Sequence, residues 1–208
     1  MRVLAIETAS EACSVALFEG TALIAHDHRI LGRGHAEQLI PMIEALPEKG
    51  RAEQIVVSLG PGSFTGVRVG LATARALGIA WRAEVLGYPT LRLVQLHAWQ
   101  PTPRAVTVCM NGGHGEWFVQ SFAADHTAED EIRSLAPDEV RAEGVHKVIV
   151  GNRAKECAAL FEDDRVFVDI LPDARKANLL RDKHLTTNLT PIYGRAPDAT
   201  PQKPKVPS

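Results

Sequence analysis

The sequence contains few cysteines and no long hydrophobic run. Its three cysteines, Cys13, Cys109 and Cys157, are widely spaced and form no CxxC pair. An odd count without such a pair is typical of reduced thiols that behave as small apolar residues. No apolar segment approaches the roughly 20 residues that a membrane-spanning helix needs. The first three residues lead directly into an apolar strand, so we expect no signal peptide and a cytoplasmic protein without membrane contact.

The sequence also lacks an excess of basic residues. The formal net charge is -2 over 208 residues, which gives no basic footprint for direct binding of nucleic acid. The hydrophobic content of 45% is ordinary for a globular protein, and the length suffices for two small domains. Two prolines near residues 100–103 mark the predicted boundary. We expect domains at 1–100 and 101–190, followed by an extended, proline-rich tail at 191–208.

Residues 60–66 (GPGSFTG) form a glycine-rich turn that does not match the phosphate-binding motifs. A P-loop requires a glycine followed by lysine and a hydroxyl residue, and this segment has neither at that spacing. A dinucleotide fingerprint requires a third glycine where the chain has Thr65. The P-loop interpretation is therefore excluded, and the dinucleotide interpretation is weak.

The helix predicted at residues 66–82 has almost no polar surface. Its charged residues form one narrow stripe, Arg68, Arg75 and Arg82, which is expected to face solvent or an acidic partner. The other positions include two rows of small residues at helical spacing, which allow a neighbouring helix to approach closely. These rows are Gly66, Gly70, Ala74 and Gly78, and Ala72, Ala76 and Ala80. Such a helix is either buried within its own domain or lies between its own sheet and a second subunit.

The order of predicted elements indicates an α/β protein with two ribonuclease-H-like domains, the fold of the actin-like ATPase superfamily. The first domain is expected to hold a mixed five-stranded sheet with helices, and the second a reduced version. In the first half, residues 3–18 are expected to form a strand, a short polar turn and a second strand. The other expected elements are 21–28, 35–46 (helix), 55–59, 66–82 (helix) and 90–99 (helix). Those of the second half are 105–110, 116–123, 137–143 (helix), 147–150, 153–161 (helix), 166–170 and 173–184 (helix).

Three segments resemble the signatures of the TsaB (YeaZ) family. They are residues 6–17 (IETASEACSVAL), 34–43 (GHAEQLIPMI) and 60–71 (GPGSFTGVRVGL), and residues 190–195 (TPIYGR) are similar to a fourth. The resemblance implies a non-catalytic subunit that pairs with a homologous catalytic subunit, TsaD. Together with an ATPase, TsaE, that subunit transfers a threonylcarbamoyl group to the adenosine 3′ of the anticodon in tRNA. The resemblance further implies that tRNA binds only through the complex and that ATP or ADP binds at the assembled complex, with no cofactor on this chain alone.

The catalytic relative holds its metal through two histidines one helical turn apart. No two of the eight histidines here are separated by four positions, so we expect neither a metal site nor catalytic residues. Glu7 replaces the usual aspartate of the family, and Asn111 begins a turn where an aspartate is common. Both changes weaken the nucleotide clamp of the superfamily. The expected vestigial nucleotide site comprises Glu7, Thr8, Ser10, Asn111, Gly112 and Gly113.

The resemblance places the partner interface on the two helices of the first domain. Without its partner, the chain is expected to form a homodimer through the same surface. The predicted interface residues are His35, Leu39, Ile43, Phe64, Gly66, Arg68, Val69, Gly70, Leu71, Ala74, Arg75 and Gly78. The alternative function is an active actin-like ATPase or phosphotransferase that uses Glu7, Thr8 and Ser10 on one side and residues 111–113 on the other.

Overall fold

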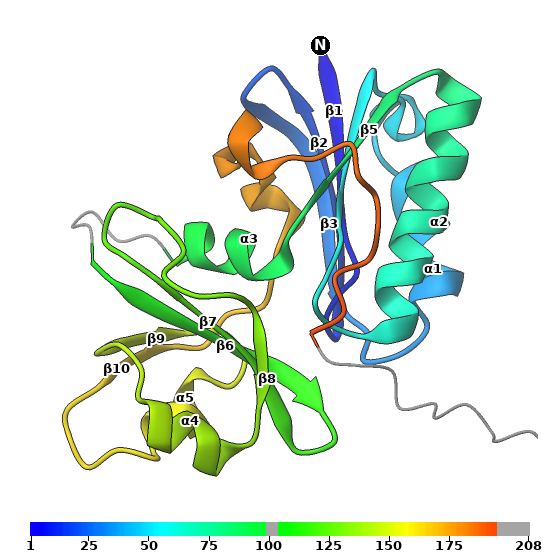
Figure 1. The fold of residues 1–208 in the computed structure, drawn as a ribbon. Helices are drawn as coiled ribbons and strands as arrows, with labels where there is room; N and C mark the ends of the chain where they lie inside the picture. The colour runs from blue at the N-terminus through cyan, green and yellow to red at the C-terminus, as the bar shows by residue number, and fades with distance from the viewer. Residues whose placement is uncertain (99–103, 195–208) are drawn as a thin grey trace, which may run out of the picture.

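The first half of the chain forms one mixed sheet (Figure 1). The computed structural model describes residues 1–98 and 104–194. Its first sheet has the order β3-β2-β1-β4-β5, in which β1 pairs antiparallel with β2 and parallel with β4. The sheet is therefore mixed and five-stranded, as predicted. Its strands are β1 (Arg2–Glu7), β2 (Ala12–Glu19), β3 (Ala22–Ile30), β4 (Gln54–Ser58) and β5 (Glu84–Tyr88).

Alternating apolar side chains cover both faces of this sheet. Leu4 and Ile6 face α1 (His35–Glu44) and α2 (Phe64–Trp81), whereas Ala5 faces the opposite side, which α3 (Thr90–His97) covers. A short 3₁₀ turn, η1 (Pro47–Gly50), follows α1. Full burial of one such aliphatic side chain contributes about 1.5–3 kcal/mol, so this central sheet anchors the first domain.

The second half repeats the strand order of the first. Its sheet has the order β10-β9-β6-β7-β8, with antiparallel pairing along β6, β7 and β8 and parallel pairing along β6, β9 and β10. Both domains therefore have the ribonuclease-H-like arrangement. The elements are β6 (Val106–Gly113), β7 (Glu116–Phe122), β8 (Arg133–Leu135), α4 (Pro137–Glu143), β9 (Val148–Val150), α5 (Ala154–Ala158) and β10 (Val166–Val168).

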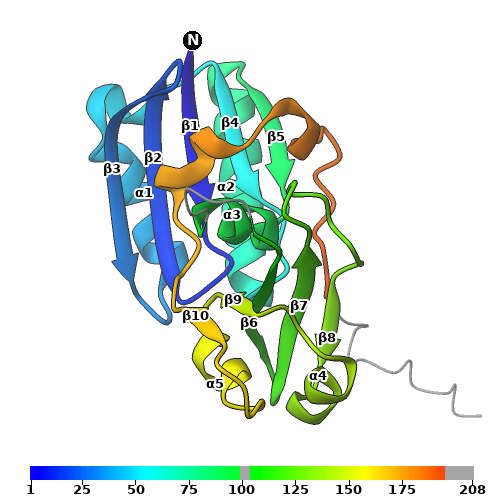
Figure 2. The same ribbon diagram turned by 90° about the vertical axis from the view of Figure 1, so that its left-hand side faces the viewer.

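Helix α3 lies between the two sheets, as Figures 1 and 2 show. Its Leu93 packs in the core of the first domain, and its Leu91 and Val94 pack in the core of the second. One short helix thus packs in both cores and joins the two domains.

The chain returns to the first domain after β10. The 3₁₀ segments η2 (Ala174–Leu179) and η3 (Asp182–His184) replace the single helix predicted at 173–184. The Ala174 amide donates to Ser14 Oγ at 2.9 Å, and the Leu180 side chain enters the core above the first sheet. The backbone is extended at Leu180, which ends the 3₁₀ segment. The sequence assigned this segment to the second domain, whereas its contacts are with the first.

Residues 186–194 run back along the first domain, and we call this segment the strap. The sequence did not predict this arrangement. Thr186 pairs with Gly87 of the edge strand β5, and Leu189 and Ile192 pack against the core below α2. The Ile192 amide donates to the Leu59 carbonyl at 2.7 Å. Residues 191–194 of the predicted tail thus belong to the strap. The predicted boundary at 100–103 and tail residues 195–208 lie outside the described residues.

Candidate functional site

The glycine-rich loop before α2 sits directly on the turn between β1 and β2. The Ser63 amide donates to the Ala9 carbonyl at 2.7 Å, and Thr8 Oγ1 donates to the Gly66 carbonyl at 2.8 Å. A Cβ atom added at Gly62 would lie 2.0 Å from the Ala9 carbonyl oxygen, and one added at Gly66 would lie 2.1 Å from that of Thr8. The glycines are thus required for the close approach of the two backbones, and the loop covers the β1–β2 turn.

His35 holds the same turn from the other side. It begins α1, is buried, and its Nε2 lies 2.9 Å from the Ser10 carbonyl and 3.2 Å from that of Ala12. A buried ring nitrogen bonded to backbone carbonyls positions the turn. His35 therefore has a structural role and lies within its own protomer, not on the predicted interface.

The other buried members of the predicted interface also face inward. A Cβ atom at Gly70 would lie 2.4 Å from Thr8 Oγ1, and one at Gly78 would lie 2.4 Å from Val85 Cγ2. The glycine row therefore fits α2 against its own sheet, and these residues offer no outer surface to a partner. For them the interface prediction is wrong, because their own sheet encloses them. The predicted residues enclosed in this way are Leu39, Ile43, Gly66, Gly70, Leu71, Ala74 and Gly78.

The alanine row of α2 faces outward instead. Ala72, Ala76 and Ala80 are exposed, and Ile79 beside them is 82% exposed. On the neighbouring α1, Ile40 is 41% exposed. We call this surface the outer α1–α2 face, and it comprises Ile40, Ala72, Ala76, Ile79 and Ala80. The three alanines belong to the small-residue rows that the sequence offered for close contact with another helix, whereas Ile40 and Ile79 were not predicted.

Two arginines of the predicted stripe bind the chain's own strap. Arg75 Nη2 donates to the Leu189 carbonyl at 3.0 Å, and Arg68 Nη2 donates to the Tyr193 hydroxyl at 2.8 Å. The Arg68 guanidinium also lies 3.3 Å from the ring centre of Phe64. Arg68, Arg75 and Arg82 are exposed, as expected for a stripe that faces solvent, but the contacts of Arg68 and Arg75 with the strap were not predicted. Phe64, 60% exposed, and the half-buried Val69 are the predicted interface residues that keep apolar surface.

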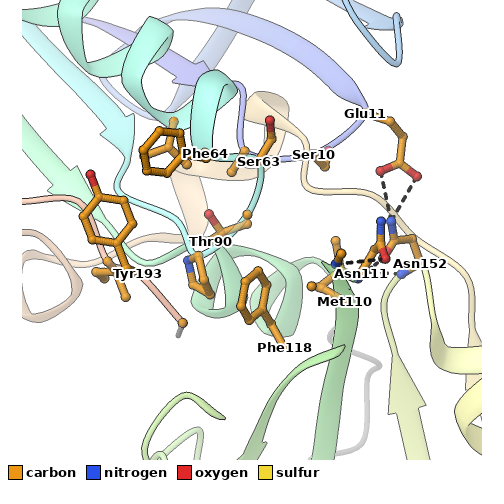
Figure 3. Close-up of a pocket in the computed structure, with 18 of the residues that line it drawn as sticks. Ser10, Glu11, Ser63, Phe64, Thr90, Met110, Asn111, Phe118, Asn152 and Tyr193 are labelled. Carbon is orange, nitrogen blue, oxygen red and sulfur yellow. Dashed lines mark hydrogen bonds between the residues drawn. The ribbon is translucent and has the colours of Figure 1, made fainter. Parts of the chain in front are cut away.

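A cleft of about 760 Å³ opens between the two domains (Figure 3). The turn after β1, the start of α2 and the strap form one wall, and the β6–β7 turn with Asn152 forms the other. Asn152 Nδ2 donates to both carboxylate oxygens of Glu11, at 2.9 and 3.0 Å, and this bridge joins the walls. The predicted residues Ser10, Asn111, Gly112 and Gly113 do line the cleft together.

Glu7 and Thr8 are fully buried and do not line the cleft. Glu7 Oε1 accepts from the Ala9 amide at 2.8 Å, and Oε2 accepts from the Tyr88 hydroxyl at 3.2 Å. Burial raises the pKa of the Glu7 carboxyl from its usual value near 4.5 to about 7. Burial likewise raises the pKa of Tyr88, so the phenol stays protonated and donates. A carboxyl enclosed in this way does not fit the role of orienting a magnesium ion beside nucleotide phosphates.

Among residues 1–98 and 104–194, no helix is long and apolar enough to cross a bilayer. Within the same ranges, no group of three or more His, Cys, Asp or Glu side chains is placed to hold a metal ion. Cys13, Cys109 and Cys157 are buried as free thiols.

Comparison with known proteins identifies the family. A family model described as TsaD, tRNA N6-adenosine threonylcarbamoyltransferase, matches residues 28–155, which is more than half of the chain. The Escherichia coli protein named tRNA threonylcarbamoyladenosine biosynthesis protein TsaB is 38% identical over 131 residues, which are 60% of this chain and 56% of that protein. The chain belongs to this family, in its TsaB (YeaZ) branch.

Other TsaB relatives give the same picture. The Haemophilus influenzae protein of that name is 34% identical over 124 residues, 53% of this chain and 51% of that protein. The chain thus spans a little over half of the length of these curated TsaB relatives. The solved structure of YeaZ from Pseudomonas aeruginosa matches with a TM-score of 0.71 at 21% identity and covers 84% of this chain and 87% of that one. This last likeness supports the shared fold.

Proposed function

We propose that this protein is a non-catalytic subunit of the assembly that forms threonylcarbamoyladenosine in tRNA. The names of its TsaB relatives support a role in this biosynthesis. The buried, hydrogen-bonded Glu7 argues against the alternative of an active ATPase or phosphotransferase, because that carboxyl is not available to a nucleotide. The assembly acts in the cytoplasm on the adenosine 3′ of the anticodon.

The outer α1–α2 face carries the proposal. It binds a TsaD-like catalytic subunit, whose family model matches this chain and which would present a homologous pair of helices. Small alanines let the partner helices approach closely, and Ile40 and Ile79 supply apolar area at the contact. In the absence of that subunit, the same face would join two copies of this chain.

The remaining partners contact this chain through the assembly. With a net charge of -2, the chain has no basic excess for tRNA, which the complex as a whole would hold. A TsaE-like ATPase would join the same assembly, and ATP or ADP would bind there and not to this chain alone.

Depletion of this protein is expected to remove threonylcarbamoyladenosine from cellular tRNA. Mass spectrometry of tRNA nucleosides measures that loss directly. Expression of the wild-type chain should restore the modified nucleoside, and Ala76→Arg, which places a charge at the centre of the outer α1–α2 face, should not. Unchanged levels after depletion would contradict the proposed pathway, whichever subunit performs the chemistry.

A further inference from the structure

We propose that the cleft between the domains binds an uncharged nucleoside and discriminates against nucleoside triphosphates. The base would lie at an aromatic end of the cleft and the ribose at a polar end. This inference stands on the lining of the cleft and is independent of the proposed partner. The volume of about 760 Å³ falls within the range of roughly 300–1,000 Å³ that is usual for small-molecule sites.

The aromatic end is formed by Phe64, Tyr193 and Phe118 (Figure 3). The rings of Phe64 and Tyr193 are 5.8 Å apart and tilted by 33°. Phe64 is 60% and Tyr193 47% exposed, although both line a concave surface. Aromatic side chains that remain exposed in a hollow are suited to stack on a flat heterocyclic ring.

The polar end lies across the cleft, where Ser10, Asn111 and Asn152 gather around Glu11. The backbone N–H of Asn111 donates to Asn152 Oδ1 at 2.8 Å. The side-chain Nδ2 of Asn152 in turn donates to the Glu11 carboxylate. Ser10 Oγ accepts from the Ala12 amide at 3.1 Å and keeps its own hydrogen for donation. These groups can both accept from and donate to the hydroxyls of a ribose.

The charges of the cleft disfavour phosphate. Phosphates are usually held by lysine or arginine side chains or by free amides at a helix start. Of the described residues lining the cleft, Arg68 alone carries such a side chain, and it stacks on Phe64 and donates to Tyr193. Two backbone N–H groups at the start of α2 are already bonded within the protein. That of Ser63 donates to the Ala9 carbonyl, and that of Gly66 donates to Ser63 Oγ. Glu11 adds a negative charge to the lining of the cleft, which disfavours an anionic ligand there.

Calorimetric titration of the full chain with adenosine and with ATP plus magnesium tests this assignment. We expect adenosine to bind more tightly than ATP. Tyr193→Ala should weaken adenosine binding about tenfold, the size of one lost stacking contact, whereas Tyr193→Phe, which keeps the ring, should retain it. Glu11→Gln removes a negative charge from the cleft and should bring the affinities for adenosine and ATP closer together. Ile24→Ala, on the exposed part of β3 and outside the cleft, is the control and should change neither affinity.

A further titration with the trinucleotide ApApA distinguishes a free nucleoside from an unpaired nucleoside within RNA as the ligand of the cleft. Tighter binding of ApApA than of adenosine would indicate an unpaired nucleoside within RNA, and weaker binding would indicate a free nucleoside. Circular dichroism melting establishes that each variant is folded. The assignment is overturned if ATP binds the wild-type chain more tightly than adenosine, if adenosine does not bind, or if folded Tyr193→Ala binds adenosine like the wild type.

Discussion

Gly66→Ala is expected to lower the free energy of unfolding by about 3 kcal/mol, although alanine is the better helix former by about 1 kcal/mol. The added Cβ would lie 2.1 Å from the Thr8 carbonyl oxygen. That oxygen belongs to the backbone of the β1–β2 turn, so no side-chain rotation can relieve the contact. Urea unfolding of both proteins measures the difference.

The matched control for this prediction is Ala72→Leu on the outward row of the same helix. Ala72 is exposed, so the larger side chain should change stability by less than about 0.5 kcal/mol. Together the two variants test whether the glycine row faces the protein's own sheet and the alanine row faces outward. A Gly66→Ala protein as stable as the wild type would contradict the close approach between α2 and the β1–β2 turn.

Glu7→Gln is expected to stabilise the protein by about 3 kcal/mol at pH 8 and to have little effect at pH 5. The pKa of Glu7 is raised by burial from near 4.5 to about 7, so between these values the folded state binds the proton that the unfolded state releases. The contribution of this carboxyl to stability is complete below about pH 4.5 and is lost as the pH rises through 7. Glutamine remains uncharged and can still accept from the Ala9 amide.

Urea unfolding of wild type and Glu7→Gln at pH 5, 6, 7 and 8 gives this difference free of other titrations, because the remaining groups are common to both proteins. The gap between the two curves should widen from pH 5 to 7 and begin to level off by pH 8. Parallel curves across this range would show that Glu7 ionises normally in the folded state. The raised pKa assigned above to the buried Glu7 carboxyl would then be wrong.

Much of the fold follows from local sequence signals. The apolar runs within residues 3–18, the rough alternation at 21–28 and the glycine motif before α2 predicted a three-strand start, a parallel strand and a long helix, and the structure confirms that order. Two strands escaped prediction for physical reasons. Glu84–Tyr88 is short, begins with a charge and contains Gly87, and Arg133–Leu135 has only three residues. Both owe their strand geometry to pairing with neighbours that local patterns do not encode.

The candidate surfaces depended more on tertiary contacts. Both small-residue rows of α2 were visible in the sequence, but composition does not say which row meets the sheet. The glycine row is the one that meets the sheet because it packs against Thr8 and Val85. Thr8 lies far from α2 in the sequence, and Val85 lies on β5. Arg68 and Arg75 likewise bind a strap more than a hundred residues away. The hydroxyl and glycine residues of the cleft were predicted, whereas its aromatic end required the strap to bring Tyr193 beside Phe64.

Binding of the TsaD-like protein from the same organism tests the role of the outer α1–α2 face most directly. Sedimentation velocity of mixtures should show a stable complex for the wild type. Ala76→Arg should weaken that complex about a hundredfold, because it would bury an unpaired charge, while its urea unfolding stays within about 0.5 kcal/mol of the wild type. Ala76→Ser, small and uncharged, should still form the complex. A folded Ala76→Arg protein that assembles like the wild type would show that the partner binds elsewhere.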